Sequence, residues 1–248
     1  MSICAELEPL TWDSQFFGLS TARLTFAPAY SSTYSSSTTE QITTTQLDEY
    51  ALVQAKVPAQ QVNVIDKLSS LGFSLVEGEA DLLLPVNPEQ TDKHQALITA
   101  TAQDIPDLKA AAASVFARSR FRTPWYQPDD SGRFYAVWAE KAVLGTFDHA
   151  CLLVNDESGK LAGFVTMRNT GAGEARIGLL AALPGRQQQG IGKKLMSAAQ
   201  QWCHNHRIQQ LRVATQISNI TALRLYTRSG AVIESTSYWL YRGRNDSI

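Results

Sequence analysis

The sequence lacks the features that mark several large classes of protein. No apolar run approaches the roughly 20 residues that a membrane-spanning helix needs. The first residues, MSICAELEPLTWD, are acidic, whereas a signal peptide begins with basic residues followed by an apolar stretch. The three cysteines, Cys4, Cys151 and Cys203, are too scattered for a disulfide framework or a cysteine-based metal site. We therefore expect a cytoplasmic protein.

Net charge is almost absent as well. The 22 Lys and Arg residues and the 23 Asp and Glu residues leave a formal net charge of -1. This balance provides no electrostatic basis for binding nucleic acid or an anionic membrane, so we expect neither as a partner. The hydrophobic content of 44% is ordinary for a globular protein, and 248 residues suffice for one large domain or two modest ones.

Apolar side chains are scarce over residues 28–46, which consist largely of serine and threonine. Such a composition predicts a solvated loop, and we place it inside an N-terminal unit because only 27 residues precede it. After the loop, the spacing of apolar residues predicts a helix over residues 47–71, broken at Pro58 and ended by Gly72. A strand is predicted over residues 73–86.

A polar connector, NPEQTDKHQ at residues 87–95, separates this part from the rest of the chain. We expect a smaller N-terminal α/β domain over residues 1–90 and a second domain over residues 91–248. In the second domain, Asp104 is placed to cap a helix that includes Pro106 near its start. The remaining segments alternate between strands and helices, which predicts an α/β fold with a central sheet. The predicted strands cover 96–100, 151–154, 161–168, 174–182, 210–216 and 235–242, and further helices cover 132–144 and 220–229.

The most informative segment is GRQQQGIGKKL, residues 185–195. A predicted strand precedes it, and Ile191, Leu195, Ala199 and Trp202 continue it with near-helical apolar spacing. The glycines therefore lie where a helix begins, with unpaired backbone N–H groups and the positive end of the helix dipole. Because glycine has no Cβ, an anion can approach this backbone closely, so the segment predicts a phosphate-binding site.

The spacing of the glycines excludes two familiar phosphate-binding loops. A dinucleotide fingerprint needs a third glycine where Leu195 stands, and a Walker loop needs a lysine where Ile191 stands. The pattern that remains, Gln187-x-x-Gly190-x-Gly192, resembles the acyl-coenzyme A pyrophosphate loop of the GNAT superfamily of N-acetyltransferases. The alternative is a polar turn followed by an unrelated helix.

A second motif favours the resemblance. About 30 residues later, NITALRLYTRSGA resembles the closing segment of that superfamily, with Asn219, Ala222, Tyr226 and Gly230 in its pattern. The two motifs in this order identify the chain as similar to GNAT proteins, and they imply the GNAT acyltransferase fold with a central mixed sheet. The resemblance implies acetyl-CoA as co-substrate, bound by Leu180, Ala181, Ala182, Gln187, Gln188, Gln189, Gly190, Ile191, Gly192, Lys193 and Asn219.

Tyr226 is the implied general acid. A lone tyrosine on a helix is usually a core or interface residue, but in this superfamily the tyrosine at this place protonates the departing thiolate. The transfer is chemically reasonable, since a phenol with a pKa of about 10 can supply a proton to a thiolate whose conjugate acid lies near 8.5.

The rest of the chain narrows the acceptor. LTWDSQFFGL, SRFRTPWYQPDDSGRFYAVW and ESTSYWLYR resemble N-acetyltransferases that act on dTDP-linked 4-amino sugars. This resemblance implies acetylation of the 4-amine of dTDP-4-amino-4,6-dideoxygalactose in enterobacterial common antigen synthesis, by a homodimer. Two alternatives are a GNAT protein acting on another amine and a non-catalytic acyl-CoA sensor.

The amine attacks only when it is neutral, so a group must accept its proton. Glu77 and Glu79 lie two apart on a predicted strand and so share a face, where paired carboxylates raise one another's pKa. Two solvated strand residues would fit the same pattern. The resemblance favours Glu77, acting through ordered water, over Glu79.

A basic and aromatic segment, SRFRTPWY at residues 119–126, follows the first helix of the second domain. Its arginines can meet a nucleotide diphosphate and its aromatic rings can stack on thymine, although the same rings can instead pack inward. We expect acceptor binding by Arg120, Arg122, Trp125 and Tyr126.

The other residues that could carry chemistry have simpler interpretations. His94, His149, His204 and His206 have no spacing typical of a metal site, so we expect no metal. Cys151 and Cys203 lie in apolar stretches and have no histidine partner, which favours direct attack in a ternary complex over a covalent acyl-enzyme.

Overall fold

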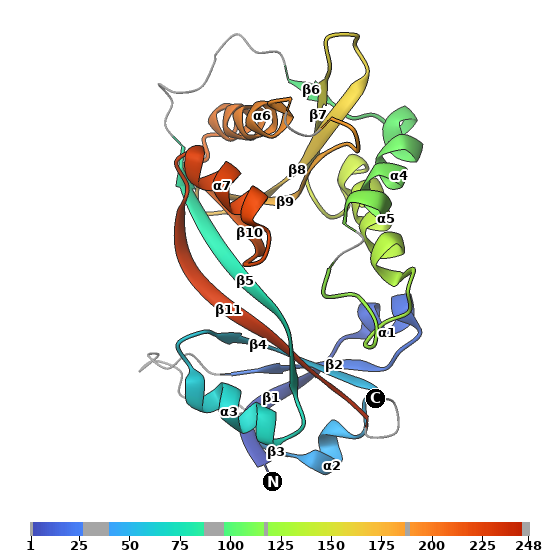
Figure 1. Cartoon of the computed structure of the whole chain (residues 1–248), viewed down its shortest axis with the longest axis vertical. Helices are drawn as coiled ribbons and strands as arrows, with labels where there is room; N and C mark the ends of the chain where they lie inside the picture. The colour runs from blue at the N-terminus through green and yellow to red at the C-terminus, as the bar shows by residue number, and fades with distance from the viewer. Residues whose placement is uncertain (1, 27–39, 87–96, 117–118, 187–188, 245–248) are drawn as a thin grey trace. The chain divides into compact units, whose positions relative to one another are not determined.

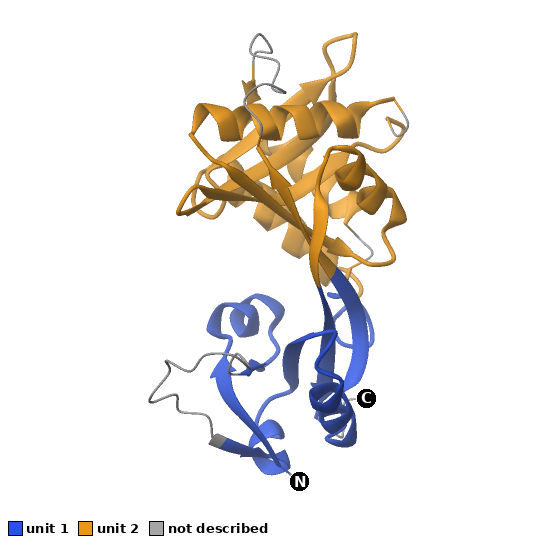
Figure 2. Ribbon diagram, turned by 90° about the vertical axis from the view of Figure 1, so that its left-hand side faces the viewer, with its two compact units in different colours: residues 1–79, 120–127, 236–248 blue, residues 80–119, 128–235 orange. Residues whose placement is uncertain are grey.

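The structure, a computed structural model, describes residues 2–26, 40–86, 97–116, 119–186 and 189–244. The chain forms two compact units, shown in different colours in Figure 2. Unit 1 contains residues 1–79, 120–127 and 236–248, and unit 2 contains residues 80–119 and 128–235. Neither unit is one continuous piece of chain. The predicted domain boundary between residues 90 and 91 lies outside the described residues and stays a prediction.

Unit 1 is built on a mixed arrangement of strands. Along it the order is β3-β1-β2-β4-β11-β5. The pairs β1–β2, β1–β3 and β4–β11 are antiparallel, whereas β2–β4 is parallel. The strands are β1 (Ser2–Pro9), β2 (Thr21–Thr25), β3 (Glu40–Thr43), β4 (Leu52–Pro58), β5 (Ser74–Pro85) and β11 (Val232–Gly243), and the helices are α1 (Thr11–Phe17), α2 (Thr44–Leu47) and α3 (Val62–Ser70).

The predicted helix over residues 47–71 is wrong in its first half. Leu47 ends the short helix α2, Leu52–Pro58 is strand β4, and the long helix covers only Val62–Ser70. Four consecutive residues of β4, Leu52 to Ala55, are buried, so both faces of this strand are covered. A strand buried on both faces has no alternation of apolar and polar residues, and its pattern is easily mistaken for a buried helix. Pro58, expected to interrupt a helix, is the last residue of the strand.

The serine- and threonine-rich segment also contains more structure than a loop. Residues 27–39 lie outside the described part, but residues 40–47 form β3 and α2. The polar composition itself supports the short helix, because Thr43 and Gln46 form a capping box. The flanking Ile42 and Leu47 are buried in the core of unit 1, which this segment therefore completes.

The end of α3 follows the sequence prediction. Gly72 has a φ of +87°, and the N–H of Phe73 donates to the Leu68 carbonyl over 3.0 Å. This left-handed glycine and the bond across it are a standard helix C-terminal motif. The chain then enters β5, the strand predicted over residues 73–86.

Unit 2 has the strand order β11-β5-β10-β9-β8-β7-β6, so β5 and β11 contribute to both units. The pair β9–β10 is parallel, and β8–β9, β7–β8 and β6–β7 are antiparallel, as a mixed sheet requires. The predicted strands and helices of this unit are confirmed, with small shifts at their ends. The elements are β6 (Ile98–Thr99), α4 (Ile105–Val115), α5 (Asp130–Val143), β7 (Ala150–Asn155), β8 (Leu161–Gly171), β9 (Glu174–Ala182), α6 (Ile191–Asn205), β10 (Gln210–Gln216) and α7 (Ile220–Arg228).

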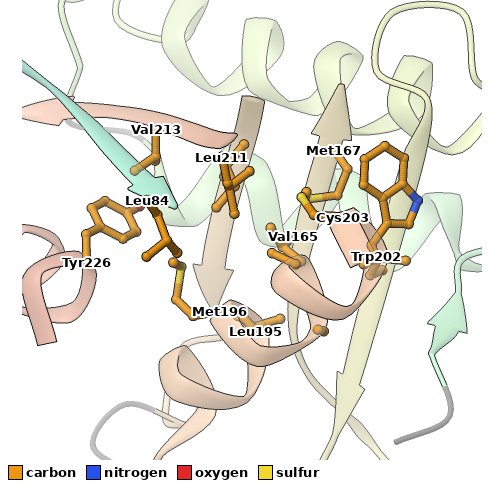
Figure 3. Close-up of a cluster of buried hydrophobic side chains, with 14 of the residues drawn as sticks. Leu84, Val165, Met167, Leu195, Met196, Trp202, Cys203, Leu211, Val213 and Tyr226 are labelled. Carbon is orange, nitrogen blue, oxygen red and sulfur yellow. The ribbon is translucent and has the colours of Figure 1, made fainter. Parts of the chain in front are cut away.

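Helices cover both faces of the unit 2 sheet (Figure 1). On one face, buried residues of α6 and α7 pack with β5, β8, β9 and β10, and Figure 3 shows part of this core. On the other face, α4 and α5 pack against β7, β8 and β9. Cys203 belongs to the first core and Cys151 to the second, in agreement with the apolar stretches in which they lie.

The cap of α4 differs from the prediction. Asp104 stands at the expected position, but its carboxylate makes no cap bond to α4. It accepts instead from the backbone N–H and the hydroxyl of Thr101, over 2.7 and 2.9 Å, in the preceding 3-10 turn. Among the described residues, no helix has both the length and the apolar character needed to cross a membrane.

Candidate functional site

The central feature of unit 2 is the separation of β9 from β10. The two strands pair in parallel only from Glu174–Gln210 to Ile177–Val213. Beyond that point β9 continues to Ala182 and β10 continues to Gln216 without pairing to each other. A pocket of about 1060 Å³ opens at the separated ends. Its walls come from β9, β10, the start of α6 and the face of α7, and its volume suits a large organic ligand.

The start of α6 forms one wall of this pocket. Gly190 is the N-cap residue in a left-handed conformation with a φ of 74°. The backbone N–H groups of the first turn, from Ile191 onward, have no carbonyl within the helix to bond to. At Gly192, a Cβ would lie 3.0 Å from Leu225 Cδ2 of α7, so glycine allows α6 and α7 to approach closely. This wall can bind an anion through backbone groups and the helix dipole.

Charge in the pocket is of one sign. The lining residues that the structure describes include Arg186, Lys193, Arg224 and Arg228 and contain no carboxylate. Arg186 is paired with Asp156 over 2.7 Å. Arg224 and Arg228 lie four residues apart on α7, and the described residues place no carboxylate in salt-bridge contact with either. This arginine pair was not predicted from the sequence, although its i, i+4 spacing places both residues on one side of a helix.

Tyr226 joins the pocket to the core of unit 2. Its side chain is only 5% exposed and lines the pocket from α7. Figure 3 shows it beside Leu84, Val213 and Met196. Burial raises the pKa of the Tyr226 hydroxyl, so the phenol stays protonated and able to donate at neutral pH.

The helix that carries Tyr226 begins and ends as its sequence predicts. The Asn219 side chain accepts from the N–H of Ala222 over 3.1 Å. At the other end, Gly230 has a φ of 96°, and the N–H of Ala231 bonds back to the Tyr226 carbonyl over 3.0 Å. These two caps fix where α7 starts and stops and therefore where Tyr226 lies along it.

Most of the residues predicted to bind the coenzyme line this one pocket. Gln187 and Gln188 lie outside the described residues. Gln189 is exposed, is not part of the lining, and donates from Nε2 to the Gly185 carbonyl over 3.4 Å. The predicted residues that line the pocket are Leu180, Ala181, Ala182, Gly190, Ile191, Gly192, Lys193 and Asn219.

In unit 1, the two glutamates of β5 differ in their surroundings. Both are half-buried and alternate with the buried Val76 and Ala80, so they share a face. The Glu79 carboxylate pairs with Lys56 Nζ over 2.5 Å and accepts from Trp239 Nε1 over 2.9 Å. Its charge is thus already compensated within the protein.

Glu77 acts electrostatically on Tyr241. Burial raises the pKa of the Tyr241 hydroxyl, the Arg120 guanidinium opposes that shift, and the negative charge of Glu77 adds to it. The carboxylate of Glu77 is therefore close enough to Tyr241 for its charge to act on that hydroxyl.

The predicted acceptor segment supplies two side chains to the interior of unit 1. Arg120 lies over the Trp239 ring, 3.9 Å from its centroid, and donates to Gln54 Oε1 over 3.2 Å and to the Tyr241 hydroxyl. Gln54 Nε2 in turn donates to the Tyr126 hydroxyl over 2.8 Å. The buried Tyr126 ring packs against Phe17, with 4.7 Å between centroids.

The other two predicted acceptor residues are more accessible. Arg122 is exposed, and its guanidinium donates to the Val76 carbonyl over 3.1 Å. Trp125 is half-buried and meets the Tyr241 ring edge-on, with 5.7 Å between centroids. The segment therefore has an inward pair, Arg120 and Tyr126, and an outward pair, Arg122 and Trp125.

Comparison with known proteins connects this geometry to one activity. Residues 115–231 match the acetyltransferase (GNAT) family. The chain is 46% identical over 242 residues to a dTDP-fucosamine acetyltransferase of Escherichia coli, covering 98% of this chain and 100% of the relative. It is 23% identical to the spore coat polysaccharide biosynthesis protein SpsD of Bacillus subtilis, covering 80% of this chain and 69% of that protein.

A solved structure shows the same fold. The GCN5-related N-acetyltransferase from Kribbella flavida superposes with a TM-score of 0.59, covering 98% of this chain and 89% of that one. The sequence identity of 15% limits this likeness to the fold.

Proposed function

Because the chain belongs to the GNAT family of acetyltransferases, we propose that it transfers the acetyl group of acetyl-CoA to the 4-amine of dTDP-4-amino-4,6-dideoxy-D-galactose. The main support for the acceptor is the relative that is 46% identical over nearly the whole chain, whose name states activity on dTDP-fucosamine. The pocket at the separated ends of β9 and β10 is the observation that carries the coenzyme part of the proposal.

The residues present fit coenzyme A. The first turn of α6 presents backbone N–H groups, and Lys193, Arg224 and Arg228 add positive charge for its phosphates. The unpaired edge of β9 over Leu180–Ala182 would bind the pantetheine arm through backbone groups, with Asn219 beside it. We propose that Gln187, Gln188 and Gln189 also bind the coenzyme, through their backbone amides. Acetyl-CoA supplies the acetyl group as a thioester.

Two side chains would move the protons. Following the resemblance, Glu77 would accept the proton of the acceptor amine through ordered water, while Glu79 pairs with Lys56 and Trp239. Tyr226 would give its phenolic proton to the departing thiolate, and its buried, protonated state suits this role. Burial raises the pKa of the Cys151 and Cys203 thiols to about 12, which disfavours either as a nucleophile and supports direct attack in a ternary complex.

For the acceptor, we propose that Arg122 and Trp125 make contact with the nucleotide and that Arg120 and Tyr126 hold the segment in place behind them. Arg122 is exposed and Trp125 half-buried, whereas Arg120 and Tyr126 already bond to Gln54. Following the resemblance, we also propose that the enzyme works as a cytoplasmic homodimer in enterobacterial common antigen synthesis.

One assay panel tests the function. Purified protein and acetyl-CoA would be incubated with dTDP-4-amino-4,6-dideoxygalactose, its gluco epimer, a polyamine and an N-terminal peptide, and acetylated products measured by mass spectrometry. We expect turnover with the dTDP-linked sugars. Turnover with the peptide or polyamine alone would refute the acceptor class, and tight acetyl-CoA binding without turnover of any amine would indicate a sensor.

A further inference from the structure

The separation of β9 from β10 coincides with an irregularity in β9. On its other edge, β9 pairs with β8, and the register passes from Val165–Leu180 to Met167–Ile177. Two steps along β8 therefore match three steps along β9, so Thr166 faces both Gly178 and Leu179. This is a β-bulge with one extra residue in β9, directly after Ile177, where pairing with β10 ends.

The bulge also exchanges the faces of β9. Before it, Ala175 and Ile177 are buried in the core beneath α6 and α7. After it, Leu179 and Ala181 are buried in the opposite core beneath α4 and α5, while Leu180 packs toward α6. One extra residue has this effect because side chains alternate along a strand with a period of two. The bulge thus decides which backbone groups of residues 180–182 face the pocket.

A buried side-chain network holds the bulge. The N–H of Leu179 donates to Thr166 Oγ1 over 2.8 Å, so the extra backbone group of the bulge is satisfied by a side chain. The Thr166 hydroxyl donates in turn to Asp148 Oδ2 over 2.6 Å. Both Thr166 and Asp148 are fully buried.

The Asp148 carboxylate is itself held by two further donors. Trp138 Nε1 donates to Oδ2 over 2.7 Å, and Arg168 Nε donates to Oδ1 over 2.8 Å. The carboxylate lies against Gly178, where a Cβ would come within 2.4 Å of Oδ2. A buried carboxylate is costly unless it is paired and hydrogen-bonded, and this one is fixed from three sides.

We infer that Thr166 and Asp148 are positioning residues for the coenzyme: they hold the bulge that aligns the Leu180–Ala182 backbone with the pantetheine arm. Neither residue lines the pocket, so their effect passes through the bulge. This inference rests on the proposed coenzyme site. It distinguishes two parts of that site, since the phosphates would bind at α6 and α7 and the pantetheine arm along β9.

The test compares two ligands by isothermal titration calorimetry. Coenzyme A contains the arm and the phosphates, whereas adenosine 3′,5′-diphosphate has no arm. In Thr166→Val, which is nearly isosteric and removes the hydroxyl, we expect the Kd of coenzyme A to rise about tenfold, as for one or two misaligned hydrogen bonds. The Kd of adenosine 3′,5′-diphosphate should stay within about twofold of the wild type.

Three further variants separate positioning from stability. Thr166→Ser keeps the hydroxyl and should restore coenzyme A binding. Asp148→Asn should weaken coenzyme A selectively as well, and it decides the question if Thr166→Val does not fold. Cys151→Ala is the control, because Cys151 on β7 pairs with Thr166 on the side away from β9. We expect it to lower Tm about as much as Thr166→Val does but to leave both Kd values unchanged.

Unchanged coenzyme A binding in folded Thr166→Val or Asp148→Asn would overturn the inference, as would equal weakening of both ligands. A wild-type protein that binds neither ligand would instead refute the coenzyme site itself, and this inference with it.

Discussion

The glycine segment at the start of α6 and the basic and aromatic segment over residues 119–126 were both predicted to bind ligands, but the fold surrounds them differently. The first lines a pocket through backbone groups that have no partner inside the helix. The second contributes Arg120 and Tyr126 to bonds with Gln54 and Tyr241. A backbone site needs only glycines and a helix start, whereas a side-chain site depends on which partners the fold supplies.

The two regions also differ in whether their charged side chains already interact with other charges. Within the part of the chain that the structure describes, the lining of the unit 2 pocket has no carboxylate, and the charges of Lys193, Arg224 and Arg228 remain available to an anionic ligand. Around Arg120, by contrast, the charged groups of unit 1 interact with one another. Burial raises the pKa of the Asp13 carboxyl, and Arg23 and Arg120 lower it. Charge that balances other charges inside a unit contributes less to ligand binding.

The largest effect should come from the acid in the pocket. Tyr226→Phe removes the proton donor but keeps the ring in its core position, so kcat should fall about 100-fold or more. The Kd of coenzyme A should change less than about twofold, since the backbone wall remains. Steady-state kinetics and calorimetry measure both, with Tyr50→Phe in unit 1 as a control. Unchanged turnover would remove Tyr226 as the acid.

The pH dependence of kcat tests whether Tyr226 is protonated during turnover. Because burial raises the pKa of Tyr226 above its ordinary value near 10, the phenol keeps its proton throughout the neutral and mildly alkaline range. We therefore expect kcat at saturating substrate to show no decline from loss of this proton below about pH 10. A decline centred near pH 8 that disappears in Tyr226→Phe would contradict this protonation state.

In unit 1 the two glutamates provide a matched pair. Glu77→Gln should lower kcat about 10- to 100-fold, because the amide cannot accept the amine proton. Glu79→Gln should leave kcat nearly unchanged and lower the free energy of unfolding by about 1 kcal/mol, because Lys56 and Trp239 lose a charged partner. Kinetics and urea unfolding measure the two effects. The reverse pattern would assign the base to Glu79.

A smaller effect should follow from the cations of α7. The double variant Arg224→Gln and Arg228→Gln removes two charges from the pocket and should raise the Kd of coenzyme A about tenfold at low salt. Added salt should reduce the difference from the wild type, because it screens the lost attraction. Lys67→Gln, on α3 of unit 1, is the control for net charge. A Kd independent of both arginines would place the phosphates elsewhere in the pocket.

The smallest effect is expected in the basic and aromatic segment. Arg122→Gln should raise KM for the nucleotide sugar about three- to tenfold with little change in Tm, because Arg122 is exposed. Arg120→Gln should lower Tm as well, since it loses the bonds to Gln54 and Tyr241 and the contact with Trp239. If the two variants behave alike, the division into an outward and an inward pair is wrong.

The elements of unit 2 could be predicted well because local signals mark them. Gly190 precedes α6, Asn219 caps α7 and Gly230 follows it, and each position agrees with the structure. Strand β4 could not be predicted in the same way. Its Leu52–Ala55 run is buried on both faces, and the strands that pair with its two edges, β2 and β11, come from other parts of the chain.

Local residue chemistry was therefore enough to specify the starts of α6 and α7, the glycine wall of the pocket and the two short motifs that indicate the family, since each depends on residues close together in the chain. The fold alone determined the bulge opposite Thr166, the pairing of Glu79 with Lys56, and the burial of Tyr126. Each of these depends on contacts between residues that are far apart in the sequence, and no local pattern encodes such contacts.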